Sequence, residues 1–352
     1  MPSGRTVRAA IVESAGAEPT LGTIELPTRR PGAAIIAVVA APLNPLDLLI
    51  ASGGFHSVRH GAPYVPGSEC VGVVVESDTH PAGTTVYGEC HASPTAPGAF
   101  ATHVLLADDD LLPLPVSTDP VLGAAVGNSG TAAFMPLVEI AAMRRGETVL
   151  VLGATGAVGQ LAVQIAHARG AGRVVGVARD RAALEGLLSL GADTVVALNP
   201  GESPEHLATR LAEAAGDVDV VLDGLFGVPL EAALRVCGPR GRVVNIGDAA
   251  GADVTLPAGL LRGKQLTVSG FAGLHTPLAQ KAPALTWLWR ALEGGDLHVP
   301  VKTFPLDQLA AAWRVQATSP HAKCVILPGQ GHRAAAPIQT DPDDAMTDES
   351  EH

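Results

Sequence analysis

Residues 148–273 alternate between short apolar segments and amphipathic segments, and this alternation restricts the chain to few folds. The apolar segments have the length and β-branched content of buried strands: TVLVLG, RVVGVA, TVVAL, VDVVLDGL, GRVVNIG and QLTVSGFAG. Helical patterns such as AVGQLAVQIAHARG and PEHLATRLAEAAG separate them. Apolar strands that alternate with helices form a parallel sheet covered on both faces. We therefore predict an α/β fold with a doubly wound parallel Rossmann sheet over residues 128–274.

The two ends of the chain have a different pattern. Residues 7–125 contain short strand-like runs such as VRAAIVES and CVGVVVES, divided by joints rich in proline and glycine. After Thr276 come a helix through KAPALTWLWRALEGG, a strand VPVKTF, a helix LDQLAAAWRVQAT and a strand KCVILP. Six strands complete the Rossmann sheet by Phe271, so this last part is expected to return to the first lobe. The predicted β-rich domain is 1–127 with 275–330, followed by a tail, 331–352.

Composition excludes several classes of function. The 352 residues are 47% hydrophobic and carry a net charge of −12 without a basic cluster, which argues against a nucleic-acid partner. The tail is acidic and is expected to be disordered. The longest apolar run, 33–41, is too short to cross a bilayer, so no membrane association is expected. The N-terminus leads into a strand rather than a signal sequence, and the four cysteines form no CxxC pair, so we expect a cytoplasmic protein.

A glycine turn follows the first strand of the predicted sheet in VLVLGATGAVGQ. In such a turn the first glycine, Gly153, permits the tight exit from the strand, Gly156 lets backbone N–H groups approach a pyrophosphate, and Gly159 lets helix and strand pack closely. The anion would lie at the helix N-terminus. A lone glycine pattern is weak in a chain with 40 glycines, but its place between strand and helix predicts a dinucleotide site.

The end of the next strand indicates which dinucleotide binds. NAD enzymes place an acid there for the ribose 2′-hydroxyl, whereas arginine accommodates a 2′-phosphate. The chain reads VVGVARDRAAL, with Ala178 at the acid's position and Arg179 and Arg181 beside it, which favours NADP(H). The alternative is that both arginines belong to a solvated helix start capped by Asp180.

These motifs together resemble the medium-chain dehydrogenase/reductase superfamily, especially its zinc-independent quinone oxidoreductase branch. The resemblance extends over residues 7–328 and rests on APLNPLDLLIASGGF, YVPGSECVGVVV, GTAAFMPLVEIAAMRRGETVLVLGATGAVG, VVNIG and VSGF. It implies that the β-rich domain is a GroES-like catalytic domain. Zinc alcohol dehydrogenases of the superfamily hold a catalytic metal with three protein ligands. Asn44, Ser68 and Gly127 stand at those positions, and only Cys90 remains in the segment of the structural zinc, so we expect no metal.

Without a Lewis acid, hydride addition to an activated double bond is easier than alcohol oxidation, because the enolate needs only hydrogen-bond donors and a proton. The resemblance implies that Asn44, Asp47 and Thr131 line the nicotinamide and substrate cleft. Asn44 has an alternative interpretation as a turn residue before Pro45, and Asp47 as an acid in the first turn of a helix. The predicted cofactor-binding residues are Gly153, Thr155, Gly156, Ala157, Val158, Gly159, Arg179, Arg181, Asn245, Gly247, Phe271 and Lys323.

The chain departs from the family at the proton donor. The tyrosines that relatives carry are Phe55 and Leu49 here. His56 is the predicted replacement, with His60, Tyr64 and water as alternatives, since histidine donates a proton near neutral pH.

The predicted function is reduction of a quinone or an α,β-unsaturated carbonyl substrate (enone or enoyl) by NADPH. The alternatives are a pathway-specific enoyl reductase, an NADPH-binding protein with a structural role, and a redox-neutral role in a cyclisation pathway. The strand QLTVSGFA would leave an apolar sheet edge exposed in a monomer. The resemblance implies that this edge pairs across a two-fold axis, so a homodimer is expected.

Overall fold

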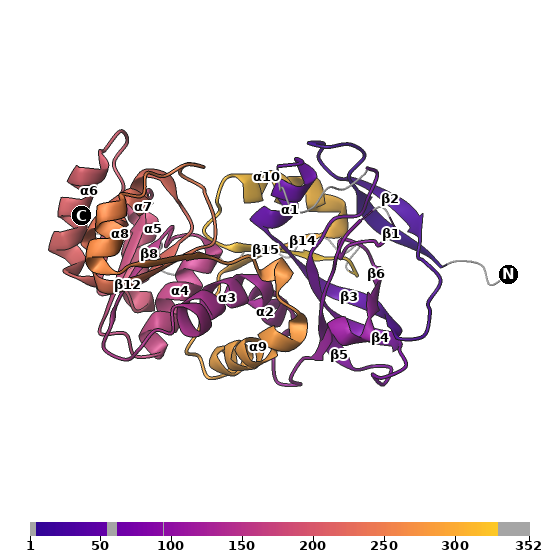
Figure 1. Cartoon of the computed structure of the whole chain (residues 1–352). Coiled ribbons are helices and arrows are strands. Elements are labelled where there is room, and N and C mark those ends of the chain that lie inside the picture. Colours follow the sequence, from indigo (N-terminus) through magenta and orange to yellow (C-terminus); the bar gives the residue numbers. More distant parts are fainter. Residues whose placement is uncertain (1–4, 55–61, 94, 330–352) are drawn as a thin grey trace, which may run out of the picture.

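The computed structural model describes residues 5–54, 62–93 and 95–329, which form two large sheets and one small one. Figure 1 shows the two large sheets in opposite halves of an elongated molecule. The predicted acidic tail, as well as His56 and His60, lies outside the described residues. Among the described residues, no helix combines the length and apolar character needed to cross a membrane.

The first large sheet has six parallel strands with the earliest strand in the centre, which confirms the predicted doubly wound fold. Its strands, in spatial order, are β10 (Thr194–Ala197), β9 (Arg173–Ala178), β8 (Thr148–Leu152), β11 (Val218–Asp223), β12 (Cys237–Asn245) and β13 (Thr267–Gly270). The helices that connect these strands are α4 (Ala157–Ala168), α5 (Arg181–Gly186), α6 (Pro204–Ala215), α7 (Gly227–Val236) and α8 (Ala258–Lys264). The central strands are buried because helices cover both faces.

The second large sheet combines strands from both ends of the chain. Its order is β14 (Val301–Pro305), β15 (Lys323–Leu327), β3 (Ala33–Leu43), β4 (Glu69–Glu76), β5 (Thr85–Glu89) and β7 (Leu111–Pro113), with β6 (His103–Ala107) beside β3. β15 runs antiparallel to β3, and Figure 1 shows these last strands, in yellow, among the N-terminal strands in indigo. β1 (Thr6–Ile11) and β2 (Thr20–Glu25) form a separate hairpin sheet.

The remaining helices lie outside the crossovers of the six-stranded sheet. They are α1 (Pro45–Ala51), α2 (Pro120–Ala125), α3 (Gly127–Phe134), α9 (Leu278–Glu293) and α10 (Leu309–Ala317), with a π-helical segment at Met135–Ile140 and single 3₁₀ turns at 108–110, 187–190, 273–275 and 306–308. α9 packs on α3 and β7, and its buried Trp289 contacts the ring of Tyr87 on β5 edge to face, at 6.1 Å between centroids. This packing fixes α9 over the edge of the second sheet.

Beside the predicted strands, residues 7–125 also contain the short helices α1 and α2. The sequence TAAFMPLVEIAAMRR predicts a helix over residues 131–145, but the helix begins earlier, at Gly127, and gives way to the π-helical segment at Met135. Pro136 lacks a backbone N–H for the α-helical ladder, which accounts for the irregular end.

Candidate functional site

The glycine turn between β8 and α4 has the geometry of an anion-binding turn. Gly153 adopts φ +86°, in the left-handed region that favours glycine. Gly156 is the N-cap of α4, and a Cβ there would meet only Gly153 O, at 3.5 Å. A Cβ on Gly159 would lie 2.3 Å from Gly153 O, so the third glycine is required for close packing. The open N-terminus of α4, with Ala157 and Val158 in its first turn, can accept a phosphate.

The end of β9 presents a cation next to this turn. Ala178 is buried, and Arg179 and Arg181 are exposed. Arg181 donates a hydrogen bond to Asn199 Oδ1 at 3.3 Å, whereas the structure assigns Arg179 no partner among the described residues. Asp180 caps α5 by accepting from Ala183 N at 3.1 Å, so the capping interpretation is also correct. Arg179 is therefore available to meet a 2′-phosphate.

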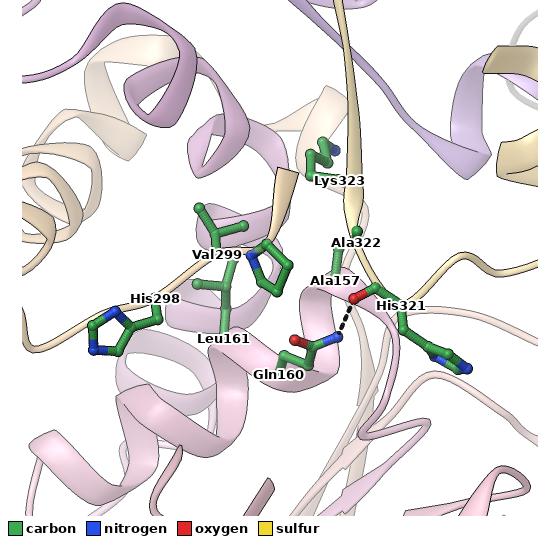
Figure 2. A pocket seen from close by; sticks show the side chains of 9 residues that line it. Ala157, Gln160, Leu161, His298, Val299, His321, Ala322 and Lys323 are labelled. Atoms are coloured by element: carbon green, nitrogen blue, oxygen red, sulfur yellow. Dashed lines mark hydrogen bonds between the residues drawn. The ribbon is translucent and has the colours of Figure 1, made fainter. Parts of the chain in front are cut away.

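The segment before β15 crosses the glycine turn. His321 contacts Thr155 O through Nδ1 at 3.1 Å and Asp180 Oδ2 through Nε2 at 3.2 Å. Figure 2 shows Gln160 on α4 pointing toward the backbone of His321, to whose carbonyl oxygen it donates at 2.8 Å. The hydrogen bond from Ala183 N, together with that from His321, lowers the pKa of Asp180. These contacts place Lys323, two residues later, at the junction of the two halves.

Lys323 and Asn44 meet inside this junction. Lys323 Nζ donates to Asn44 Oδ1 and, at 2.8 Å, to Ser129 Oγ. The amide of Asn44 donates to Glu69 Oε1 at 2.8 Å and to Ser68 Oγ at 3.2 Å. Asn128 Nδ2 adds a contact of 3.4 Å to Asn44 Oδ1. The predicted residues Asn44 and Lys323, distant in sequence, are thus direct partners.

Asp47 and Glu69 bring two carboxyl groups to the buried contacts of Asn44 and Lys323. We call these four residues, with Ser68 and Ser129, the Asn44 cluster. Asp47 Oδ2 accepts from Asn44 N at 2.8 Å, so it also serves as the acid in the first turn of α1. Burial raises the pKa of Asp47 to about 7, against the opposing effect of the Asn44 hydrogen bond, and neighbouring Glu69 raises it further. Burial lowers the pKa of Lys323, which Glu69 and Asp47 partly offset. The cluster can therefore exchange a proton near neutral pH.

The other predicted residues lie around the glycine turn and the Asn44 cluster. Thr131 is buried on α3, and its hydroxyl donates to Gly127 O at 3.0 Å. Asn245 Nδ2 donates to Gly247 O at 2.7 Å and to Asp223 Oδ2 at 2.8 Å, which fixes the loop after β12. Phe271 N donates to Asn245 O at 2.9 Å. Asn245 and Phe271 thus lie at the carboxyl end of the parallel sheet, where ligands of doubly wound folds bind.

Of the proton-donor candidates, Tyr64 is the one that the structure describes. Its backbone forms an isolated antiparallel β-bridge with Val12, the residue after β1. Burial and the nearby charge of Asp47 raise its pKa to about 12, so its phenol is a weaker acid than usual. Leu49, at the position of a family tyrosine, is exposed on α1.

The residues at the zinc-ligand positions do not fit a zinc ion. Asn44 accepts from the Lys323 ammonium, which brings a positive charge where a metal would need ligands. A Cβ on Gly127 would lie 2.3 Å from Glu69 Oε2 and 2.4 Å from the Tyr87 ring, so a longer ligand side chain has no room. In the described part of the chain, no group of three His, Cys, Asp or Glu side chains could hold a metal.

Several members of the site are not among the residues predicted from the sequence. Glu69, Ser129, Gln160 and His321 make the contacts that hold Asn44, Lys323 and the glycine turn in place. Glu69 stands in the quoted motif YVPGSEC, so its proximity to Ser68 was a usable sign. Gln160 ends the quoted glycine-turn motif VLVLGATGAVGQ, whereas Ser129 and His321 stand in no quoted motif, and only the fold brings them to the site.

Comparison with known proteins supports a family assignment. The family model described as "Alcohol dehydrogenase GroES-like domain" matches residues 30–116, and the one described as "Zinc-binding dehydrogenase" matches residues 157–289. The chain is 28% identical over 293 residues to the quinone oxidoreductase of Sus scrofa, covering 82% of this chain and 86% of that protein. It is 30% identical over 311 residues to a component of the phenolphthiocerol/phthiocerol polyketide synthase of Mycobacterium tuberculosis, covering 87% of this chain but 14% of that component.

Solved structures share the whole architecture. A probable oxidoreductase from Mycobacterium abscessus superposes with a TM-score of 0.76 at 28% identity, over 92% of this chain and 100% of that one. A mycobacterial protein, Rv1454c, solved in complex with NADPH, superposes with a TM-score of 0.77 at 23% identity, over 92% of this chain and 100% of that one. At that identity the second structure supports the fold alone.

Proposed function

This chain belongs to the medium-chain dehydrogenase/reductase superfamily, among its quinone oxidoreductase-like members, and on that premise we propose that it reduces a quinone or an α,β-unsaturated carbonyl compound without zinc. It is an NADPH-dependent oxidoreductase. The observation that carries the proposal is the Asn44 cluster, in which amide and lysine donors replace a metal's ligands beside the predicted nicotinamide site.

The cofactor NADP(H) fits the glycine turn and the adjoining end of β9. The glycine turn and the N-terminus of α4 would hold the pyrophosphate, and Arg179 the 2′-phosphate. Gly247 and Phe271 would border the nicotinamide through backbone groups, and Lys323 would approach the adjoining ribose. Bound there, NADPH supplies the hydride.

The residues of this chain have to stabilise the negative charge that hydride addition leaves on the substrate oxygen. Asn128 brings a neutral amide donor to the cleft, and the buried cluster with Asp47 can exchange a proton. Hydrogen-bond donors are sufficient for an enolate or a hydroquinone anion, whereas alcohol oxidation usually relies on a Lewis acid. This is the argument for an activated double bond as the acceptor.

A second candidate is reduction of an enoyl thioester within a biosynthetic pathway. Its support is the similarity to a segment of the polyketide synthase component, of whose length the chain spans about one seventh. The missing family tyrosines at Phe55 and Leu49 weigh against it. Enone or quinone reduction therefore remains our first proposal.

We further propose that the protein is a cytoplasmic homodimer. β13 pairs with β12 alone and forms one edge of the six-stranded sheet, where Val268 is exposed. Natural proteins rarely leave such an edge unpaired. The four cysteines are buried and unpaired, which suits a reducing compartment.

The test is oxidation of NADPH by the metal-free protein with a naphthoquinone, a simple enone and an enoyl thioester, with NADH as the control. Turnover of the quinone or enone with preference for NADPH is expected. Turnover of the thioester alone would favour the second candidate. Tight binding of NADPH without turnover of any acceptor would contradict both.

A further inference from the structure

A small hollow that is open to solvent, with about 30 Å³ of water-accessible space, lies between the two halves of the molecule, next to the Asn44 cluster. Ser68 and Glu69 on one side, Asn128 on α3, and Leu274 and Lys281 on the other side line it, among others. The loop after β13 forms part of its wall, because a Cβ on Gly273 would lie 3.5 Å from Asn128 Oδ1. The hollow therefore adjoins the sheet edge at which the nicotinamide is proposed to lie.

Lys281 is an unusual lining residue, because its side chain is only 2% exposed. Its ammonium donates to Glu89 Oε2 at 2.6 Å and to Gly273 O at 3.0 Å. An ammonium group has three N–H donors. Within the described part of the chain the structure gives the third donor no acceptor, and the residue borders the hollow.

The pair of Lys281 and Glu89 is difficult to explain by stability alone. Burying an ion pair costs desolvation energy that its attraction often does not recover, and apolar residues of similar size would serve as well. Apolar packing between Trp289 and Tyr87 already joins α9 to β5. Burial also raises the pKa of Glu89, and the charge and hydrogen bond of Lys281 oppose this rise.

Nearby polar groups lead from Lys281 to the Asn44 cluster. Tyr87 donates its hydroxyl hydrogen to Glu69 Oε2 at 2.8 Å and lies 3.5 Å from Glu89 Oε1. Asn128 N donates to Glu69 Oε2 at 2.6 Å. Glu69, Glu89 and Tyr87 thereby hold fixed positions around the hollow, which the Lys281 side chain also lines, together with the imidazole of His91.

We propose that Lys281 is a further catalytic residue, whose free N–H donor binds the carbonyl oxygen of the substrate and supplies its proton. The inference rests on the proposed function. After hydride has added to the double bond, the Nζ–H bond breaks, its electron pair stays on nitrogen, and an O–H bond forms on the enolate or hydroquinone oxygen. The enol then tautomerises to the saturated carbonyl compound, and Lys281 regains a proton from water through the open side of the hollow.

The first test needs no turnover and uses 4-nitrophenol, whose visible absorption reports the phenolate. Its apparent pKa is measured in complex with the protein, with and without NADP⁺. The wild type should lower it by about one unit, and Lys281→Met/Glu89→Gln, which removes both charges together, should abolish the shift. Glu89→Gln alone should enlarge the shift, because it leaves the ammonium without its partner. Equal shifts in wild type and double variant, or no binding to the wild type, would overturn the inference.

The second test is the rate of NADPH oxidation with the best acceptor. Lys281→Met/Glu89→Gln should reduce kcat on the order of 100-fold and leave the Kd of NADPH unchanged, whereas Lys302→Met, on the exposed face of β14, should leave both unchanged. Methylammonium should restore part of the rate to Lys281→Ala, which a purely structural lysine would not allow. Unchanged kcat in a folded double variant would overturn the inference. A wild type that shifts nitrophenol but reduces no acceptor would overturn the proposed reductase function alone.

Discussion

At the scale of single residues, the buried charges around Asn44 determine how the site responds to pH. Three carboxyl groups, of Asp47, Glu69 and Glu89, share this region with two lysines, Lys281 and Lys323. Buried charges without a counter-charge are costly, so a set with an excess of one acid favours retaining a proton. Asp47, with a pKa of about 7, is the group best placed to hold it.

The pKa of Asp47 predicts a specific dependence of stability on pH. The folded pKa of about 7 exceeds the ordinary value of 3.8, so between these values the folded state binds more protons than the unfolded state. The free energy of unfolding therefore falls as pH rises through this window, by about 1.4 kcal/mol per unit from this group. Asp47→Asn should gain about 2–3 kcal/mol relative to wild type between pH 5 and 7. Urea unfolding at several pH values measures this, and parallel curves for the two proteins would contradict it.

Arg179 allows a prediction about cofactor choice. Arg179→Ala should weaken NADPH binding on the order of 10–100-fold, because a charge-assisted contact to the 2′-phosphate is lost, and should leave NADH binding unchanged. Fluorescence titration with both cofactors measures the two Kd values. Arg181→Ala is the matched control, since Arg181 already contacts Asn199, and it should have the smaller effect. An equal loss for NADH and NADPH in Arg179→Ala would refute the assignment.

The sequence was sufficient to identify Asn44, Asp47 and Lys323 as candidates, but not to reveal how they interact. The contact between Lys323 and Asn44 joins residues 279 positions apart, and no local pattern encodes such a contact. Lys281 and Glu89 belong to no motif, and their proximity depends on how α9 packs on β5. The roles assigned to these residues remain predictions.

At the scale of elements, local patterns predicted the strands and helices of the Rossmann sheet because periodicity and packing agree there. They failed at α3, whose first residues GNSG are poor helix formers. Packing selects these glycines, since a Cβ on Gly130 would lie 2.6 Å from Leu288. Close approach to α9 therefore overrides helix propensity at this element.

The turn between β8 and α4 predicts different outcomes for two of its glycines. Gly156→Val should preserve the fold, because space exists at that Cβ, but should abolish binding of NADPH and NADH by blocking the pyrophosphate. Gly159→Ala should destabilise the protein by about 1–3 kcal/mol, because its Cβ would press on the backbone of Gly153 and Ala154. Thermal unfolding and cofactor titration of both variants separate the two effects. Retained cofactor binding in Gly156→Val would contradict the turn's proposed role.

At the scale of the whole molecule, the site exists because two halves of the chain meet. The six-stranded sheet supplies the glycine turn and the loops after β12 and β13, and the other sheet supplies Glu69 and Lys323. The return of the last strands to β3 brings His321 and Lys323 over α4. Division of the chain at residues 127/128 and 274/275 remains our proposal for the domain boundaries.

The exposed edge at β13 leads to the prediction for assembly. If two copies pair through this edge, light scattering should give about twice the mass of one chain. Val268→Lys should shift the protein toward the monomer, because a charge at an apolar edge strand opposes pairing. Val116→Lys, at a fully exposed position away from β13, is the control and should remain dimeric. A wild type that is monomeric at all concentrations would refute the proposed dimer, whereas the contacts of the glycine turn and of Asn44 with Lys323, which lie within one chain, would be unaffected.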